Sequence, residues 1–311
     1  MATKVPKYSF SNSSHSSEVK NGYWYIYLKA SGTLTLTYAK SNVEVFLCGG
    51  GGGGAGCGYG NWTAGSGGGG GYTKTQTGIA VTSGKSYSIV VGAGGEAGGS
   101  EETQTAGGKS SAFGYSANGG GAGNQTISPE SLQPGGAGTG AGGKGGTSSY
   151  DSGDNDYDYT NPENGGAGVL AFGTGSVYYG GGGGGGKAVY CTVTASGGKS
   201  GGGAGGDARG NGTKGTANTG GGGGGGGGVV FGESSTKGGA GGSGIVIIRG
   251  TEDDLIPVHF NGTQLSKIIF NGTEVKSLIF DGTKLYFERI KRRFCEWFTS
   301  TKAVRRSRAM I

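Results

Sequence analysis

Residues 43–54 read Val-Glu-Val-Phe-Leu-Cys followed by six glycines, so an apolar segment continues without a break into a glycine run. Valine and phenylalanine favour β-strands, whereas glycine has no side chain to bury. The reverse junction occurs at residues 242–249, where Gly-Ser-Gly leads into Ile-Val-Ile-Ile-Arg. We expect the two apolar segments to pair as buried strands, which would anchor the glycine runs at one end.

Pure glycine runs recur through the middle of the chain, at residues 49–54, 67–71, 180–186 and 220–228. With 81 glycines and 5 prolines among 311 residues, composition alone is compatible with disorder. The alternative is the extended polyproline II geometry, which has three residues per turn and no internal hydrogen bonds, and in which glycine allows close approach of neighbouring chains. Strand-anchored ends, segments of similar length and 16 tyrosines favour the ordered alternative.

Further strand-like segments flank the first glycine runs. They are residues 23–28, 33–38, 79–81 and 87–91, of which the last two are expected to pair. The predicted fold is mostly irregular and β: a bundle of polyglycine II helices capped by short β-strands, followed by a small β-hairpin repeat module. The predicted organisation is an N-terminal segment at 1–20, a glycine-rich β/polyglycine II domain at 21–250, a decapeptide β-hairpin repeat module at 251–287 and a basic C-terminal tail at 288–311.

Three stretches carry a resemblance to a known family: VEVFLCGGGGGGAG at 43–56, TGIAVTSGKSYSIVVGAGG at 77–95 and GGSGIVIIRG at 241–250. They resemble the glycine-rich domain common in bacteriophage tail proteins, which is similar in turn to the polyglycine-sandwich tip adhesins of T-even-like phages. The resemblance covers about residues 23–250. In those adhesins, polyglycine helices display loops that bind host surface receptors, so the resemblance implies a virion tail protein. The chain departs from them in carrying a further C-terminal module.

A ten-residue repeat follows the glycine-rich region, in which a phenylalanine precedes Asn-Gly-Thr or Asp-Gly-Thr three times. Asn-Gly or Asp-Gly between apolar residues is a strong hairpin signal, so we expect a meander of four strands. Both faces of this small sheet would be apolar, and one sheet cannot hide both. We expect either packing on the glycine-rich domain or homo-oligomerisation, with a trimer favoured by analogy with tail fibres. The oligomerisation candidates are Phe260, Phe270, Phe280, Leu265, Val275 and Leu285.

The net charge of +6 comes from the end of the chain, because residues 288–311 hold eight Lys or Arg and two Glu. A nucleic-acid-binding surface is therefore not expected on the remainder. The basic tail is either an amphipathic helix that docks on a partner or a partly ordered terminus. The first 17 residues lack the apolar segment of a signal peptide, and no stretch is long enough for a membrane-spanning helix. We expect synthesis in a host cytoplasm, incorporation into a virion tail and no membrane insertion.

The sequence carries no recognisable catalytic or metal-binding motif. Three Gly-Lys-Ser triplets lack the glycine five positions earlier that a phosphate-binding loop requires. His15 and His259 are isolated, and the four cysteines have no CxxC spacing, so free thiols are expected. An acidic cluster resembles a calcium loop in density but lacks the EF-hand glutamate; its members are Asp151, Asp154, Asp156 and Asp158. We expect no enzyme activity, no metal and no cofactor.

The inserts between glycine runs are rich in Tyr, Ser, Gly and Asn, as antibody paratopes are. Recognition residues concentrate on loops held by a rigid scaffold, and loops reached after an odd number of glycine segments should lie opposite the strands. The predicted receptor-binding residues are Tyr59, Trp62, Tyr150, Asp154, Asp156, Tyr157, Tyr159, Phe172, Tyr178 and Tyr179.

The expected function is that of a non-enzymatic phage tail fibre or tip protein that binds a host receptor through these loops. Its partners would be other tail proteins and a bacterial surface glycan or outer protein. The alternative is a structural virion or fibre-forming protein in which the glycine-rich slabs mediate assembly without receptor binding. A flexible secreted matrix protein is a third interpretation, and it would leave the glycine runs without stable hydrogen bonds.

Overall fold

The computed structural model of the chain forms two compact units, Met1–Gly250 and Thr251–Ile311, which are described separately. Some of the predicted features lie outside the residues that the structure describes: the receptor-binding candidates Tyr59, Trp62 and Asp154, and the basic tail at 288–311. The structure describes residues 5–37, 42–57, 63–99, 102–125, 135–144, 147–151, 156–199, 201–230 and 233–251, together with short paired segments between 259 and 287.

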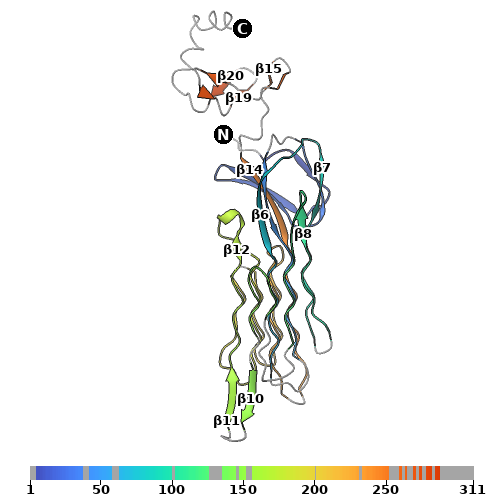
Figure 1. Ribbon diagram of the computed structural model, residues 1–311, viewed down its shortest axis with the longest axis vertical. Coiled ribbons are helices and arrows are strands. Elements are labelled where there is room, and N and C mark those ends of the chain that lie inside the picture. The colour runs from blue at the N-terminus through green and yellow to red at the C-terminus, as the bar shows by residue number, and fades with distance from the viewer. Residues whose placement is uncertain are drawn as a thin grey trace, which may run out of the picture. The chain divides into compact units, whose positions relative to one another are not determined.

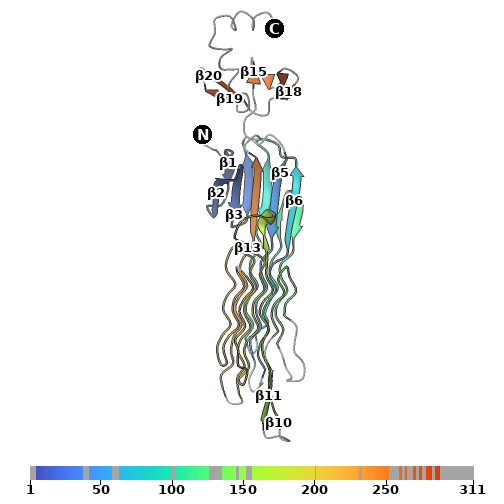
Figure 2. The same cartoon turned by 90° about the vertical axis from the view of Figure 1, so that its left-hand side faces the viewer.

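One end of the first unit consists of two five-stranded sheets (Figures 1 and 2). The first sheet has the order β1-β4-β7-β8-β9, with bounds Tyr8–Phe10, Gly32–Leu36, Ser86–Val90, Ser110–Ala112 and Tyr115–Ala117. The second sheet has the order β2-β3-β14-β5-β6, with bounds His15–Lys20, Tyr23–Leu28, Ile245–Thr251, Val43–Cys48 and Thr73–Ile79.

The core lies between the two sheets and follows from the alternation of apolar residues along the strands. Trp24, Ile26 and Leu28 are fully buried on β3, whereas the tyrosines between them are half-buried on the outer face. Leu34 and Leu36 on β4 are also fully buried, which confirms the face predicted from the Thr-Leu alternation. This small sandwich supplies the apolar burial that the glycine segments cannot.

The strand pairing predicted from the two glycine junctions is confirmed. β5 and β14 pair antiparallel, with Ile245 opposite Cys48 and Arg249 opposite Glu44. The predicted pairing of residues 79–81 with 87–91 is wrong, because β6 pairs with β5 and β7 pairs with β4 and β8. The chain crosses from one sheet to the other between β6 and β7. The Ser-Gly-Lys sequence between them predicts a tight turn, but it does not distinguish a hairpin within one sheet from a crossing between two sheets.

The predicted N-terminal segment at 1–20 contributes a strand to each sheet. β1 pairs with β4, and β2 pairs with β3 in a hairpin whose turn is Asn21-Gly22. Both turn residues have positive φ, 52° and 77°, as a two-residue type I′ connection requires. The segment is therefore part of the sandwich and not a separate extension.

From the sheets, glycine-rich segments run side by side away from the strands and back (Figure 1). Along residues 49–55, consecutive backbone N–H groups donate to three different neighbouring segments in rotation. Each neighbour is therefore reached by every third residue. The acceptors are Tyr72, Gly69 and Ser66 for the first segment, Gly108 and Thr105 for the second, and Gly242 and Gly239 for the third.

The carbonyl groups of the same run accept from three further segments with the same period. The donors are Gly120 and Gly123, Gly95 and Gly98, and Gly223 and Gly226. One glycine run thus has six hydrogen-bonded neighbours, and residues 49–57 are buried along their whole length. Glycine is required by this close approach: a Cβ on Gly52 would overlap the carbonyl oxygen of Gly121, and one on Gly223 that of Gly239.

The described residues of the second unit form three antiparallel strand pairs. They are β15 (His259–Phe260) with β16 (Thr263–Gln264), β17 (Ile269–Phe270) with β18 (Thr273–Glu274), and β19 (Leu278–Asp281) with β20 (Lys284–Phe287). Among these described residues each strand pairs within its own repeat. The four-stranded meander stays a prediction, because most of the module lies outside the described residues. Leu265 and Val275 lie outside the described residues, and Phe260, Phe270, Phe280 and Leu285 are placed on strands.

Candidate functional site

The end of the first unit away from the sheets is formed by chain turns between glycine segments (Figures 1 and 2). We call it the distal end; its described parts include the β10–β11 hairpin and residues 187–194, 207–210 and 233–237. Because the segments bond to one another along their length, the two chains entering each turn are fixed. The scaffold thus holds several short loops in one place.

The hairpin of β10 (Thr147–Asp151) and β11 (Asp156–Thr160) projects from the distal end (Figure 1). Its register pairs Tyr150 with Tyr157 and Ser148 with Tyr159. Positions 150, 157 and 159 therefore share one face, because opposite residues and alternate residues of antiparallel strands do so. Tyr159 is 47% exposed. Three of the predicted receptor-binding tyrosines are thus brought together at the distal end.

The base of the hairpin is tied to the neighbouring loop. The thiol of Cys191 donates to the carbonyl oxygen of Thr160 at 3.1 Å, and the side-chain oxygen of Asn161 accepts from the backbone N–H of Thr192 at 3.0 Å. Cys191 is buried, and burial is the main reason that the pKa of its thiol is raised. The cysteine acts here as a small buried donor that locks two turns together.

Ion pairs connect the other distal turns. Lys187 Nζ lies 3.0 Å from Asp207 Oδ1, and Arg209 Nε lies 2.6 Å from Glu233 Oε1. The hydrogen bond from Lys187 is the main cause that lowers the pKa of Asp207, and the bond from Arg209 does the same for Glu233. Two more pairs lie nearby, Lys237 with Glu102 and Lys144 with Glu163. Surface pairs of this kind contribute little each, but the first three link the turns that contain Lys187, Asp207, Glu233 and Glu102 in succession.

Asp156, another predicted candidate, begins β11 of the hairpin. Phe172, Tyr178 and Tyr179 belong to a different part of the unit, at its sheet end (Figure 1). β12 (Val169–Leu170), η1 (Ala171–Gly173) and β13 (Tyr178–Tyr179) form a turn that covers the outer face of the second sheet. Tyr179 is 7% exposed and packs on Phe46, with ring centroids 5.2 Å apart. This insert and the hairpin were both predicted to bind the receptor. The glycine-rich segment between them runs from the distal end to the sheet end, so the two lie at opposite ends of the unit (Figure 1).

Phe172 has a packing role in this cover. Its ring lies 6.0 Å from that of Phe46, and the guanidinium of Arg249 lies 4.1 Å from its centroid. Arg249 also bonds Glu44 through Nε at 3.0 Å and Nη2 at 2.7 Å. The Nζ atom of Lys199 lies over the ring of Tyr178, 4.6 Å from the ring centroid.

Among the residues that the structure describes, no group of three or more His, Cys, Asp and Glu side chains is placed to hold a metal ion. In the same part of the chain there is no helix with the length and apolar character needed to cross a membrane. Asp154 and the centre of the acidic cluster lie outside the described residues.

The fold and the distal turns define a glycine-rich scaffold that displays loops. Residues 29–251 match the sequence family described as a glycine-rich domain, which is well over half of the chain. The chain therefore belongs to the glycine-rich domain family. A search of the curated proteins gave no match.

Proposed function

We propose that the glycine segments are polyglycine II helices. This geometry has three residues per turn and directs its N–H and C=O groups outward in three directions. The rotation of hydrogen-bond partners along residues 49–55, with the same neighbour every third residue, is the observation that supports it. A bundle of this kind is rigid because every segment is bonded on several sides.

On this scaffold, the function that the arrangement supports best is a non-enzymatic phage tail fibre or tip protein that binds a host surface receptor. The observation that carries the proposal is the gathering of turns at the distal end, with the tyrosine face of the β10–β11 hairpin projecting from it. Tyrosine provides a large contact area and loses little side-chain entropy on binding. The receptor would be a bacterial surface glycan or outer protein.

The phage assignment is supported by the resemblance of the strand-to-glycine junctions to those of phage tail proteins. Attachment to other tail proteins and homo-oligomer contacts are assigned in this proposal to residues 251–311. The protein would be carried on the virion tail and would require no cofactor.

Adsorption of particles to host cells tests the proposal. Particles carrying Tyr157→Ala together with Tyr159→Ala should adsorb at least tenfold more slowly than unaltered particles. Tyr72→Ala is the matched control, because Tyr72 is 43% exposed and precedes β6 at the sheet end. Unchanged adsorption of the double variant in intact particles would contradict the proposal and would favour the structural alternative.

A further inference from the structure

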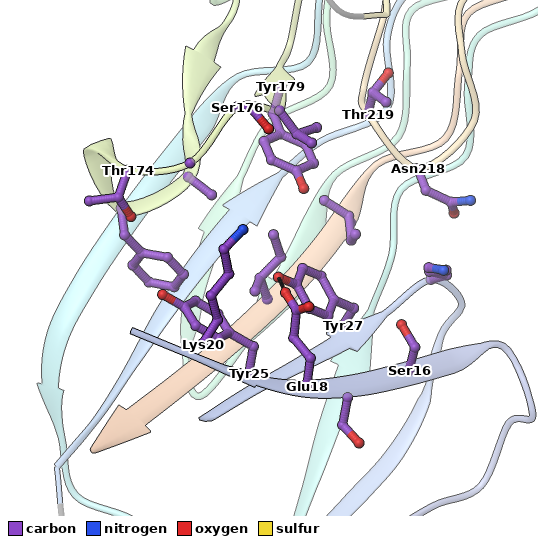
Figure 3. Close-up of a pocket in the computed structure, with 18 of the residues that line it drawn as sticks. Ser16, Glu18, Lys20, Tyr25, Tyr27, Thr174, Ser176, Tyr179, Asn218 and Thr219 are labelled. Carbon is purple, nitrogen blue, oxygen red and sulfur yellow. Dashed lines mark hydrogen bonds between the residues drawn. The ribbon is translucent and has the colours of Figure 1, made fainter. Parts of the chain in front are cut away.

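A pocket of about 590 Å³ lies on the outer face of the second sheet (Figure 3). The sheets form the end of the unit opposite the distal turns (Figure 1). It is lined by β2 and β3, by the turn at residues 171–177, by residues 217–219 and by β14. Its volume falls within the range of roughly 300–1,000 Å³ that is typical of small-molecule sites. The pocket is separate from the receptor-binding site proposed above.

Aromatic rings form two sides of this pocket. Tyr25 and Tyr27 alternate on β3, with ring centroids 6.1 Å apart and planes inclined by 19°. Phe172 and Tyr179 face them from the covering turn, and the ring of Phe172 lies 6.3 Å from that of Tyr25. Aromatic rings present a negative face, which attracts weakly positive C–H groups.

The turn holds Phe172 in an unusual backbone conformation, with φ 53° and ψ 20°. A bulky residue rarely adopts this left-handed region, and such a conformation persists only where the surroundings impose it. Here Arg249 and the ring of Phe46 hold the side chain. The wall of the pocket is therefore fixed in place.

Polar groups enter the pocket between the rings (Figure 3). Tyr27 donates its hydroxyl to Glu18 Oε1 at 2.7 Å, which leaves Glu18 Oε2 without a hydrogen bond to any described residue. The hydroxyl of Tyr179 also points into the space. Burial is the main reason that the pKa of Tyr179 is raised to about 12. Burial is also the main reason that the pKa of Tyr27 is raised, and the shift is larger there. Both hydroxyl groups therefore stay neutral and can donate hydrogen bonds. Asn218 adds an amide.

The composition of the pocket restricts its ligand. The charges that line it are of both signs, with Lys20 and Lys29 opposed by Glu18, so neither a cation nor an anion meets a lining of uniformly opposite charge. Glu18 Oε1 and Asn218 Oδ1 already accept from Tyr27 and Ser243, but a purely apolar ligand would cover Glu18 Oε2 without providing a hydrogen bond, which costs about 1–3 kcal/mol for a buried group. A sugar ring has an apolar C–H face for the aromatic walls and hydroxyl groups for the polar ones. We propose that this pocket binds a neutral saccharide.

Saturation-transfer NMR on the full chain tests the proposal. The probes are neutral saccharides built from glucose, galactose, mannose and N-acetylglucosamine, with N-acetylneuraminic acid and acetylcholine as charged comparisons. We expect transfer to at least one neutral saccharide, and a loss of at least fivefold in Tyr27→Ala and in Glu18→Gln. Tyr27→Phe keeps the ring and should retain more transfer than Tyr27→Ala.

Two controls separate this site from others. Tyr72→Ala removes an exposed tyrosine outside the pocket and should leave the transfer unchanged. The Tyr157→Ala and Tyr159→Ala background removes any transfer through the distal hairpin, and in it Tyr27→Ala and Glu18→Gln should still lower the transfer at least fivefold, so the two proposals can fail independently. The proposal would be overturned by absence of transfer to the whole neutral panel, by stronger transfer to a charged probe, or by transfer in Tyr27→Ala and Glu18→Gln equal to that of the unaltered chain.

Discussion

Gly223 donates its backbone N–H to the carbonyl oxygen of Gly52 at 2.9 Å, and Gly52 donates to the carbonyl oxygen of Gly69 at 2.8 Å. These three residues belong to segments that are distant in sequence, and all three are buried. A buried backbone group without a partner is costly, so such bonds leave few alternative arrangements. The glycine bundle is thus specified by hydrogen bonding and close approach, whereas the sandwich is specified by apolar packing.

Replacing Gly223 by alanine should disrupt the bundle. The added Cβ would overlap the carbonyl oxygen of Gly239. The backbone of Gly239 cannot move away, because its segment is hydrogen-bonded to neighbours on several sides. Overpacking of a well-packed core costs about 1–3 kcal/mol, and we expect a loss at the upper end of this range or beyond, because the clash is with backbone. Chemical denaturation followed by tyrosine fluorescence measures the change.

Gly99→Ala is the matched control for this substitution. A Cβ at Gly99 would approach the end of the flexible Glu102 side chain at 3.0 Å and no backbone atom at that distance. We expect a loss of less than about 1 kcal/mol. Equal destabilisation by Gly223→Ala and Gly99→Ala would contradict the account of glycine as the residue of close approach.

The sequence was sufficient to predict the anchoring of the glycine runs. Residues 43–47 and 245–248 each combine β-propensity with a direct glycine junction, and both signals are local. The alternation at Leu34 and Leu36 was equally readable, because one face of a sandwich strand must be apolar. Which segment neighbours which in the bundle could not be predicted, because glycine carries no side-chain pattern that distinguishes one neighbour from another.

The candidate sites were predicted only in part, for two physical reasons. Composition predicts the tyrosines of the β10–β11 hairpin as receptor-binding residues, and it predicts Tyr179 for the same surface, although Tyr179 packs on Phe46 at the other end of the unit. Tyrosine serves packing and recognition equally well, and only the direction of the chain separates the two ends. The sequence carries only a local signal for the pocket: Asn21-Gly22 is typical of a type I′ turn, and that turn places Glu18 opposite Tyr25. The turn at residues 171–177 that completes the pocket is distant in sequence, and no local pattern links it to β3.

Arg249→Lys should destabilise the sandwich measurably. The Arg249 side chain is 12% exposed and that of Glu44 24%, and the guanidinium makes two bonds to one carboxylate while lying over Phe172. Lysine keeps the charge but cannot reproduce the paired bonds and the stacking. We expect a loss of about 1–3 kcal/mol in the free energy of unfolding. Arg209→Lys, at an exposed pair, should change it by less than about 1 kcal/mol; a similar loss in both variants would contradict this explanation.

The thiol of Cys48 should resist alkylation until high pH. Burial raises its pKa from an ordinary value near 9.0 to about 12, so the folded chain keeps the thiol protonated where an unfolded chain forms thiolate. Because the folded pKa is the higher one, its contribution to stability is complete below about pH 9 and is lost as pH rises towards 12. Iodoacetamide labelling mapped by mass spectrometry should show slow modification of Cys48 at pH 9 and rapid modification in denaturant. Rapid labelling of the folded chain at pH 9 would contradict this prediction.

Lys187→Met should raise the pKa of Asp207 towards its ordinary value, because the hydrogen bond from Lys187 is the main cause of its depression. A carboxyl whose folded pKa is depressed stabilises the fold above its ordinary pKa, and this contribution disappears as pH falls through the folded value. Carbonyl-carbon NMR titration of Asp207 measures the shift directly. Lys214→Met, which removes an exposed lysine outside this pair, should leave the titration unchanged. The same Asp207 pKa in unaltered chain and Lys187→Met would show that the pair does not hold the two distal turns together in solution.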